Sequence, residues 1–509
     1  PTPTVEWTLP ALQATGVSAT QTVRVRFSEI MNPTSISTAT FTLASGITQI
    51  PGMVSVSSDA REARFVPTSH MPYSVTLTAR LTTGIRSAAG QALASAYSWT
   101  FATRPSPSWS EPVQLENDFT DLGSASSLDI ALDDDENAVA VWNQTQGLRS
   151  SRSTAGGPWS AVASIGPGYL PSTAADGAGG FLTVWGTGDS IECIRAVPSG
   201  TWGSPEDVVS TTTNPARPLE MISDAAGNSF LFYYEQGPAP LNDFVFVVRF
   251  DAELGWETPI ATGAQRSNYP AFAADASGVA VVVWTGTGGT GGLRARRYLP
   301  GSGWTGEEII EPYVAGRPTT LPRAAMDGTG KCIVTYFKRI EGGLAYDLEF
   351  YTSRSTPTTG WTAEDLVPVP ADHNLSGSRV ALGKDGSAMV TWHDIAGKHC
   401  WASYQASPGG WTSPEAIDLP GASNGSLGTP FYTEHGRVAV IGVQDYGTYD
   451  EVWTNELVPG SGWSGASSLY VSEGEDAGLI LTLDSKGKAA VILKEYDSTL
   501  RDIWVMRYR

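Results

Sequence analysis

A short motif recurs along most of the chain, and it limits the possible folds more than any other feature of the sequence. Its form is D-x-x-G-x5-[W/Y], in which a turn former begins a bend, Gly accepts a positive φ and an aromatic residue closes the following apolar run. The stretch "YPAFAADASGVAVVVWTG", residues 269–286, shows both runs. The strict copies are Asp176…Gly179…Trp185, Asp224…Gly227…Tyr233, Asp275…Gly278…Trp284 and Asp327…Gly330…Tyr336. Each copy predicts two antiparallel strands around a tight turn.

Four looser copies bring the number of units to eight. They are Asp133…Trp142 with Glu136 at the Gly position, Gly386…Trp392 with Gly383 at the Asp position, Gly442 after Gly436, and Leu493 after Gly487. The last two, in units seven and eight, lack the aromatic residue at the end of the second strand.

A second marker falls between the copies, a Trp that follows a Gly, Pro or Ser turn and begins a short strand. These residues are Trp109, Trp159, Trp202, Trp256, Trp304, Trp361, Trp411 and Trp463, spaced 43 to 57 residues apart. That spacing is typical of the four-stranded blades of a β-propeller. An arginine recurs on the third strand, at Arg152, Arg195, Arg249, Arg297, Arg354 and Arg507. We expect these repeated Trp and Arg side chains to join the blades.

The units predict an all-β protein whose residues 109–509 form an eight-bladed propeller, or a seven-bladed one if a unit is irregular. The strand after Trp109 has no blade before it, and the final "DIWVMRYR" has no outer partner. Pairing the two completes the eighth blade and removes exposed sheet edges.

Residues 1–103 have a different pattern, with short alternating strands such as Val23–Val25–Phe27 that indicate half-buried sheets. The segments "RFSEIMNPTSI", "ATFTL", "ARFVP", "YSVTLTA", "GIRSAAGQAL" and "WTFAT" closely resemble the bacterial Ig-like domain of S-layer and other exported proteins. The resemblance implies a β-sandwich that serves as a spacer or attachment module. Residues 104–108, within "ATRPSPSW", are Pro-rich and indicate a stiff linker.

Charge and composition exclude several partners. The net charge is −20, with about +3 on residues 1–104 and about −23 on the rest, and such a surface repels nucleic acid. Cys193, Cys332 and Cys400 show no metal-binding spacing. No apolar run is long enough for a membrane helix. We expect a monomer at the cell surface or outside the cell, with any signal or lipid anchor outside this sequence.

The irregular loops of units five to eight are the predicted ligand site, because loops that enter inner strands and leave second strands gather around a propeller's axis. The predicted ligand-binding residues are Glu311, Tyr313, Lys338, Arg339, His373, Asp445, Tyr446, Lys494 and Tyr496. Repeated side chains are poor candidates, since they recur for packing reasons.

Catalytic or metal-binding chemistry has fewer candidates. The candidate acid–base or nucleophilic groups are His393, Asp394, Asp445, Tyr446 and Glu495, and the candidate metal ligands are His373, His393, Asp394 and His399. Their spacing matches no dedicated motif, so exposed loop residues are the simpler interpretation. No cofactor is expected, although the acidic turns can bind Ca²⁺ weakly.

Three functions fit these features. The first is an exported binding protein that recognises a neutral glycan or a protein surface, similar in architecture to bacterial propeller lectins. The second is a glycoside hydrolase or polysaccharide lyase that uses the loops of units five to eight; a sialidase is disfavoured because its Asp-box is absent. The third is a structural adhesin or envelope scaffold. The sequence leaves open whether the protein is an enzyme, and favours a binding protein.

Overall fold

The structure, a computed structural model, divides into two compact units, Pro1–Ser108 and Trp109–Arg509. It describes residues 2–508 except 18–21, 69–70, 104–107, 117–126, 145–146, 177–178, 198–200, 212–213, 225, 237–242, 267–269, 287–291, 341–346, 371–374, 395–398, 408, 422–426, 434–435, 448, 459, 473–477 and 497–500. Nearly all regular structure is β-strand, with one short 3₁₀ helix, η1 (Pro33–Ser35), in this part of the chain. No helix among the described residues has the length and hydropathy to cross a membrane.

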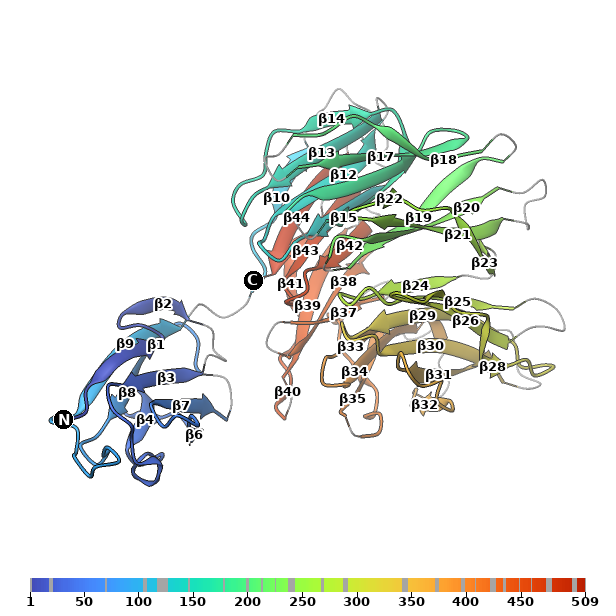
Figure 1. Cartoon of the computed structure of the whole chain (residues 1–509). Helices are drawn as coiled ribbons and strands as arrows, with labels where there is room; N and C mark the ends of the chain where they lie inside the picture. The colour runs from blue at the N-terminus through green and yellow to red at the C-terminus, as the bar shows by residue number, and fades with distance from the viewer. Residues whose placement is uncertain are drawn as a thin grey trace. The chain divides into compact units, whose positions relative to one another are not determined.

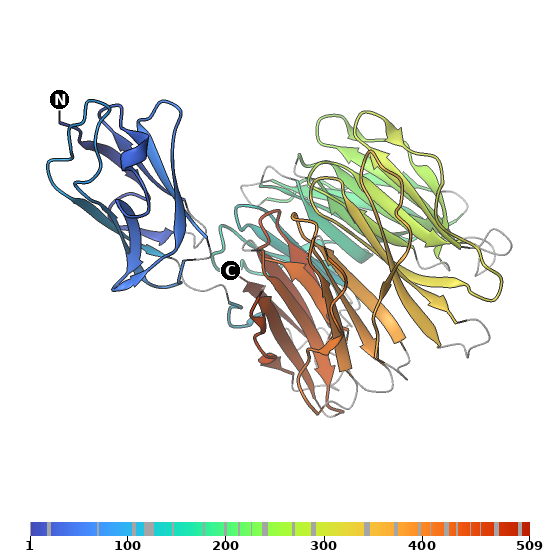
Figure 2. The same cartoon turned by 90° about the horizontal axis from the view of Figure 1, so that it is seen from below.

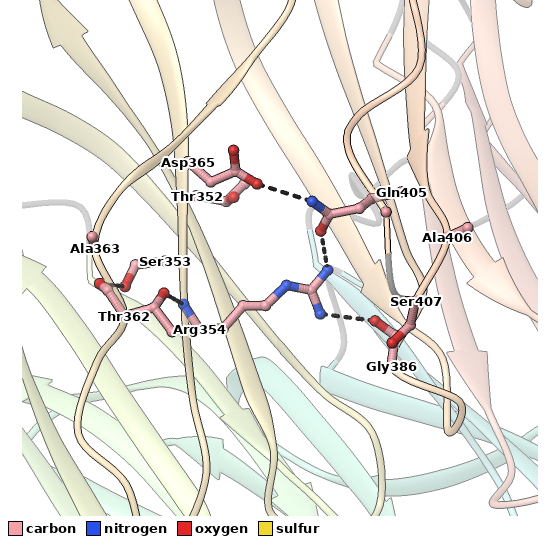
Figure 3. A pocket seen from close by; sticks show the side chains of 11 residues that line it. Thr352, Ser353, Arg354, Thr362, Ala363, Asp365, Gly386, Gln405, Ala406 and Ser407 are labelled. Atoms are coloured by element: carbon pink, nitrogen blue, oxygen red, sulfur yellow. Dashed lines mark hydrogen bonds between the residues drawn. The ribbon is translucent and has the colours of Figure 1, made fainter.

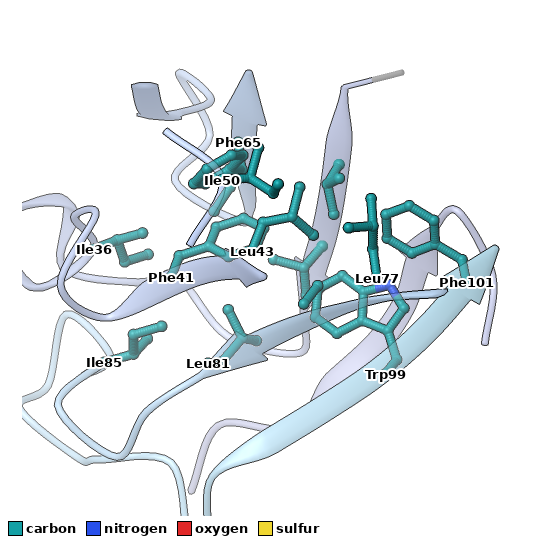
Figure 4. Close-up of a cluster of buried hydrophobic side chains, with 14 of the residues drawn as sticks. Ile36, Phe41, Leu43, Ile50, Phe65, Leu77, Leu81, Ile85, Trp99 and Phe101 are labelled. Atoms are coloured by element: carbon teal, nitrogen blue, oxygen red, sulfur yellow. The ribbon is translucent and has the colours of Figure 1, made fainter. Parts of the chain in front are cut away.

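The first unit is a β-sandwich, as the sequence predicts. One sheet has the order β1 (Val5–Leu9), β3 (Val23–Phe27), β7 (Glu62–Pro67), β6 (Gly52–Val56), and the other the order β2 (Ala14–Val17), β9 (Tyr97–Thr103), β8 (Thr76–Leu81), β4 (Phe41–Ser45), β5 (Thr48–Gln49). Residues of β3 alternate between buried and half-buried. Figure 4 shows Phe41, Phe65, Trp99 and Phe101 gathered in the core, each at most 2 % exposed.

The second unit is an eight-bladed propeller, which confirms the predicted fold (Figures 1 and 2). Blade 1 consists of β11 (Leu128–Leu132), β12 (Ala138–Gln144), β13 (Gly147–Ser153) and β14 (Ala163–Gly166), and blade 2 of β15 (Tyr169–Ala175), β16 (Phe181–Gly186), β17 (Ser190–Ala196) and β18 (Glu206–Ser210). Blade 3 consists of β19 (Ala216–Ser223), β20 (Ser229–Glu235), β21 (Phe244–Asp251), β22 (Gly255–Trp256) and β23 (Ile260–Gln265). Blade 4 consists of β24 (Ala271–Ala274), β25 (Ala280–Thr285), β26 (Gly292–Leu299), β27 (Gly303–Trp304) and β28 (Glu308–Pro312).

Blades 5 to 8 continue the same up-and-down order. They are β29 (Thr319–Met326), β30 (Cys332–Arg339), β31 (Leu348–Ser355), β32 (Asp365–Val367); β33 (Leu375–Leu382), β34 (Ala388–Asp394), β35 (His399–Gln405), β36 (Glu415–Ala416); β37 (Thr429–Tyr432), β38 (Val438–Asp445), β39 (Asp450–Val458), β40 (Gly462–Trp463), β41 (Ser467–Val471); and β42 (Gly478–Leu483), β43 (Ala489–Tyr496), β44 (Arg501–Tyr508) with β10 (Val113–Glu116).

Blade 8 closes the ring with strands from both ends of the unit. β10 pairs antiparallel with β44, with Val113 opposite Val505 and Gln114 opposite Trp504. The inner strand of this blade, β42, contacts β11 of blade 1 and β38 of blade 7, and the inner strands of blades 1 to 7 contact one another in chain order. In Figure 1 the last strands, in red, accordingly lie beside the first blade.

The repeated Trp and Arg side chains join neighbouring blades. Indole N–H groups donate to the third strand of the preceding blade, from Trp202 to Ser150 Oγ (3.1 Å) and from Trp109 to Thr454 Oγ1 (3.2 Å). Arg195 lies over Phe250 of the next blade at 5.2 Å from the ring centroid. These contacts agree with the expected structural role.

The turns between first and second strands also follow the expected chemistry. Gly179, Gly227, Gly278, Gly330, Gly386, Gly436 and Gly487 all have φ between 70° and 86°, and Glu136 takes the same region at 63°. Asp224 Oδ1 accepts the backbone N–H groups of Ala226 and Asn228, both at 2.9 Å. The turn aspartates are therefore used in holding the turns.

Blades 7 and 8 take their aromatic residue from the adjacent strand. Gly442 of β38 lies opposite Trp453 of β39, and a Cβ on this glycine would lie 2.8 Å from the indole. Trp453 is fully buried, like Trp185 of blade 2. In blade 8 Leu493 lies opposite Trp504. The aromatic residue that the sequence motif lacks is thus supplied by the third strand, so its loss from the motif leaves no gap.

Candidate functional site

The predicted site residues of the described chain lie on one face of the propeller. Because successive strands of a blade are antiparallel, the loops leaving second strands and the loops entering inner strands share a face, which we name the loop face. The predicted residues lie at the loop-face ends of β28, β30, β34, β35, β38 and β43 or just after them. His373 lies outside the described residues, and so does the side chain of Tyr496.

Glu311 and Lys338 meet between blades 4 and 5. Lys338 Nζ lies 2.5 Å from Glu311 Oε1 and also pairs with Glu364, and it sits 5.0 Å from the Tyr351 ring centroid. Burial disfavours the charge of Lys338, but the two glutamates outweigh burial and raise its pKa. The Lys338 side chain is only 4 % exposed, so its main role is to form the ion pairs of this cluster. Tyr313 nearby in sequence is 45 % exposed, and Arg339 is half-buried.

Residues of blades 6 and 7 form a second group, which we name the blade 6–7 cluster: His393, His399, Asp418, Gln444 and Tyr446. Asp418 is its centre, with Oδ1 3.2 Å from His399 Nδ1 and Oδ2 accepting from Cys400 N at 2.9 Å and Gln444 Nε2 at 3.3 Å. Its side chain is 2 % exposed. The sequence hypotheses missed Asp418, which follows the outer strand of blade 6 and has no motif around it.

Burial and nearby acidic groups shift the pKa values of two residues of this cluster, His393 and Tyr446. Burial lowers the pKa of His393, against the opposing influence of Asp394 and Asp418. Burial raises the pKa of Tyr446, and Glu451, Tyr449 and Asp418 raise it further. At neutral pH His393 is therefore a neutral imidazole and Tyr446 a phenol, and both can exchange hydrogen bonds with a polar ligand.

A pair of stacked tyrosines borders the cluster. Tyr446 and Tyr449 lie across the turn after β38, with ring centroids 4.9 Å apart and planes 12° from parallel. The turn holds them there, since Tyr446 N donates to Tyr449 O at 3.0 Å and Gly447 N donates to Asp445 Oδ1 at 2.5 Å. Gly447 adopts a φ of 83°, which an L-residue rarely takes. Asp445 therefore shapes the turn, and the two rings form a flat edge half-exposed to solvent.

The remaining predicted groups lie apart from the cluster or inside the fold. Glu495 is buried and accepts hydrogen bonds from Tyr470 Oη (2.6 Å), Ser472 Oγ (2.9 Å) and Trp504 Nε1 (3.2 Å). It therefore joins blade 8 to blade 7. Asp394 is fully buried, and Lys494 is half-buried on β43. Among the described residues no group of three His, Cys, Asp or Glu side chains is placed to hold a metal ion.

A pocket of about 420 Å³ opens between blades 5 and 6 on the opposite face (Figure 3). Arg354, one of the repeated arginines, crosses it and donates to Gly386 O (2.9 Å) and Gln405 Oε1 (2.5 Å). Gln405 Nε2 in turn donates to Asp365 Oδ2 at 2.9 Å. The polar groups of this pocket are satisfied by each other and brace the two blades.

One further ring of residues, which we name the channel ring, lies on the inner strands. Its members stand four residues before the turn position of each blade, and each pairs with the residue twelve positions further along the second strand. In blade order they are Asp129, Ser172, Glu220, Ala271, Arg323, Arg379, Thr429 and Ile480. The sequence hypotheses missed the four charged members, although the alignment of turns places them in one column.

Several solved structures resemble parts of this chain at low sequence identity. A lectin, BP39L from Burkholderia pseudomallei, is 14 % identical over 68 % of this chain and all of its own, with a TM-score of 0.47. A PL25 ulvan lyase is 10 % identical over 77 % of this chain and 95 % of its own, with a TM-score of 0.48. Polysaccharide lyase Uly1 is 13 % identical over 65 % and 88 %, at 0.43.

These likenesses concern shape and say nothing about ligand or activity. Comparison with curated protein sequences finds no match. Residues 1–103 match the family profile of the bacterial Ig-like domain.

Proposed function

We propose that this chain is an exported bacterial binding protein whose propeller recognises a neutral glycan at the blade 6–7 cluster. The Ig-like unit would serve as a spacer, in keeping with its resemblance to domains of exported proteins. The propeller part carries about −23 charges, which favours neutral ligands over anionic polymers. A protein surface is the alternative ligand.

The stacked pair Tyr446–Tyr449 is the observation that carries this proposal. Sugar rings present apolar C–H faces that pack on aromatic rings, and their hydroxyl groups need nearby donors and acceptors. Tyr446 and Tyr449, stacked on each other and half-exposed, supply the aromatic rings. His393, His399 and Gln444 of the same cluster supply polar groups, and the buried carboxylate of Asp418 holds His399 and Gln444 by hydrogen bonds.

A panel of neutral glycans tests the proposal. We expect a saturable signal with the intact chain, reduced at least tenfold by Tyr446→Ala, which corresponds to about 1.4 kcal/mol. Phe244→Ala is the matched control, because Phe244 is a 50 % exposed aromatic at a loop-face strand end of blade 3. Equal binding by both variants, or no binding by the folded wild type, would contradict the proposal. A protein partner found in the latter case would favour the scaffold function.

A carbohydrate-active enzyme is the second candidate, favoured by the lowered pKa of His393. A neutral imidazole and a phenol at one ligand site would have the chemistry of an acid–base pair. Incubation with a polysaccharide panel should then release new reducing ends or unsaturated products, and His393→Gln should abolish the release. Binding without product release would reject the enzyme and leave the binding function.

A further inference from the structure

The channel ring is divided into an acceptor side and a donor side. Asp129 Oδ2 of blade 1 accepts from Thr173 N of blade 2 at 2.8 Å and from Ser172 Oγ at 3.0 Å. Ser172 Oγ accepts in turn from Met221 N of blade 3 at 3.1 Å. Acceptor side chains at this ring position therefore satisfy the free N–H groups of the next inner strand.

Blades 5 and 6 break this scheme, because Arg323 and Arg379 can only donate. Each gives one hydrogen bond to the carbonyl of the residue just before it, Arg323 Nη1 to Pro322 O at 2.8 Å and Arg379 Nη1 to Ser378 O at 3.1 Å. Neither has a carboxylate within ion-pair distance among the described residues. A guanidinium has five N–H groups, so most donors of both side chains remain available.

The two arginines are neighbours in a confined space. Their strands β29 and β33 contact each other, and both side chains are half-buried. Burial lowers the pKa of both, and the charge of Arg323 lowers that of Arg379 further. Glu220 attracts both cations without forming an ion pair with either, so the two arginines still repel each other, and an anion placed between them reduces that repulsion.

Glu220 limits the charge of the anion that fits. Burial raises the pKa of this carboxyl to about 7, Asp129 adds to the rise, and Arg323 and Arg379 oppose it. Although the surrounding strands restrict water around its carboxyl group, Glu220 remains exposed to solvent, so a small molecule can reach it. Two arginines stand against two carboxyl groups, those of Glu220 and Asp129, whose pKa values are raised to about 7 and about 6, so the ring carries at most a small net positive charge at neutral pH, and a monoanion fits it better than a dianion.

We propose that Arg323 and Arg379 bind the carboxylate of a small ligand inside the central channel. The planar carboxylate matches the forked geometry of guanidinium groups. Glu220, on blade 3, faces the same space and interacts with a hydroxyl or amino group of the ligand. This site is distinct from the blade 6–7 cluster and does not depend on it.

Calorimetric titration of the full chain with D-glucuronate at low salt tests this site, with D-glucose as the neutral match. We expect one saturable site per chain for glucuronate and none for glucose, and at least a tenfold loss of affinity in Arg323→Gln/Arg379→Gln. Arg294→Gln is the control, since Arg294 lies on the third strand of blade 4 and pairs with Glu307 at 2.5 Å. Arg379→Lys, which keeps the charge and loses the fork, should weaken binding less than the double variant.

Two outcomes overturn the proposal: wild type that fails to bind glucuronate, or a double variant that binds it as well as wild type. If the double variant does not fold, by circular dichroism and thermal melting, the comparison of Arg379→Lys with Arg294→Gln decides. Tighter binding of an oligogalacturonate than of glucuronate identifies a glycan chain as the source of the carboxylate, and equal binding identifies a free acid. Tyr446→Ala should leave glucuronate affinity unchanged, which separates this site from the proposed neutral-glycan site.

Discussion

The arginines on the third strands of the blades and those of the channel ring differ in their hydrogen-bond and ion-pair partners. Arg297, on the third strand of blade 4, donates from Nε to Glu308 at 3.0 Å and from Nη1 to Thr356 O at 2.5 Å in the next blade. Arg323, on the inner strand of the neighbouring blade, donates only to its own preceding carbonyl among the described residues. A residue that recurs and is fully paired holds the ring together, whereas Arg323, which breaks the repeat and forms no ion pair among the described residues, belongs to the proposed ligand site.

The largest effect on stability is expected at Trp453, the third-strand residue that replaces the second-strand aromatic residue of the repeat. Trp453→Ala should lower the free energy of unfolding of the propeller by about 3–5 kcal/mol, because a fully buried indole leaves a cavity. Trp185→Ala in blade 2 should cost a similar amount if Trp453 takes over the role of the second-strand aromatic. Denaturant unfolding measures both, and a much smaller cost for Trp453→Ala would refute that equivalence.

The two kinds of arginine should differ next. Arg297→Ala should destabilise the propeller by about 2–3 kcal/mol, because it removes the cationic partner of Glu308 and the donor to two carbonyl groups. Arg323→Ala should change stability by less than about 0.5 kcal/mol or raise it, since it removes a repelling cation. Differential scanning calorimetry of the two variants compares them directly; equal destabilisation would remove the distinction drawn above.

Gly442→Ala should have a smaller effect than Trp453→Ala. The new Cβ would lie 2.8 Å from the Trp453 ring, and relieving such a clash costs about 1–3 kcal/mol. The melting temperature of the propeller should therefore fall. The double variant Gly442→Ala/Trp453→Ala should show a non-additive cost, and strict additivity would mean that the two residues do not share a space.

The pH dependence of the free energy of unfolding tests the acidic residues of the channel ring. The pKa of Glu220 is raised in the folded chain to about 7 from an ordinary 4.5, and that of Asp129 to about 6 from 3.8. Between the unfolded and the folded pKa of each group the folded state holds more protons than the unfolded state, so stability falls as pH rises from about 4 to about 7 and levels off above that. Glu220→Gln should flatten the fall between about pH 4.5 and 7, as followed by melting temperature. If the substitution left the pH profile of the melting temperature unchanged, Glu220 would not contribute to the pH dependence of stability.

The sequence predicted the ring because its determinants repeat. Gly179 and its equivalents, together with the marker Trp residues, recur at spacings that only a blade satisfies, and the Ig-like segments lie in contiguous stretches. Trp453 was missed because it compensates for Gly442 through strand pairing, which a motif on one strand does not reveal. Asp418 was missed because its role arises from contacts with His399 and Gln444.

The charged residues of the channel ring could have been found from the sequence by comparing the residues at one aligned position in all eight units. Arg323 and Arg379 occupy the column where other units have Asp, Ser or Ala, and only the ring geometry shows that this column faces one shared space. The site hypotheses concentrated instead on loop residues, some of which, such as His373, fall outside the described chain. Of the predicted candidates, Lys338 and Glu495 prove to be held by neighbouring blades, and no sequence pattern encodes those partners.

The closing pair β10–β44 also gives the chain a mechanical property. Since β10 follows the first unit in the chain, any tension applied through that unit would enter the propeller through the strand that closes it. Ladder hydrogen bonds lie perpendicular to the strands, so a pull along β10 would load them together in shear and they would resist as a group. The closing strand pair is therefore the first part of the propeller to bear such a load.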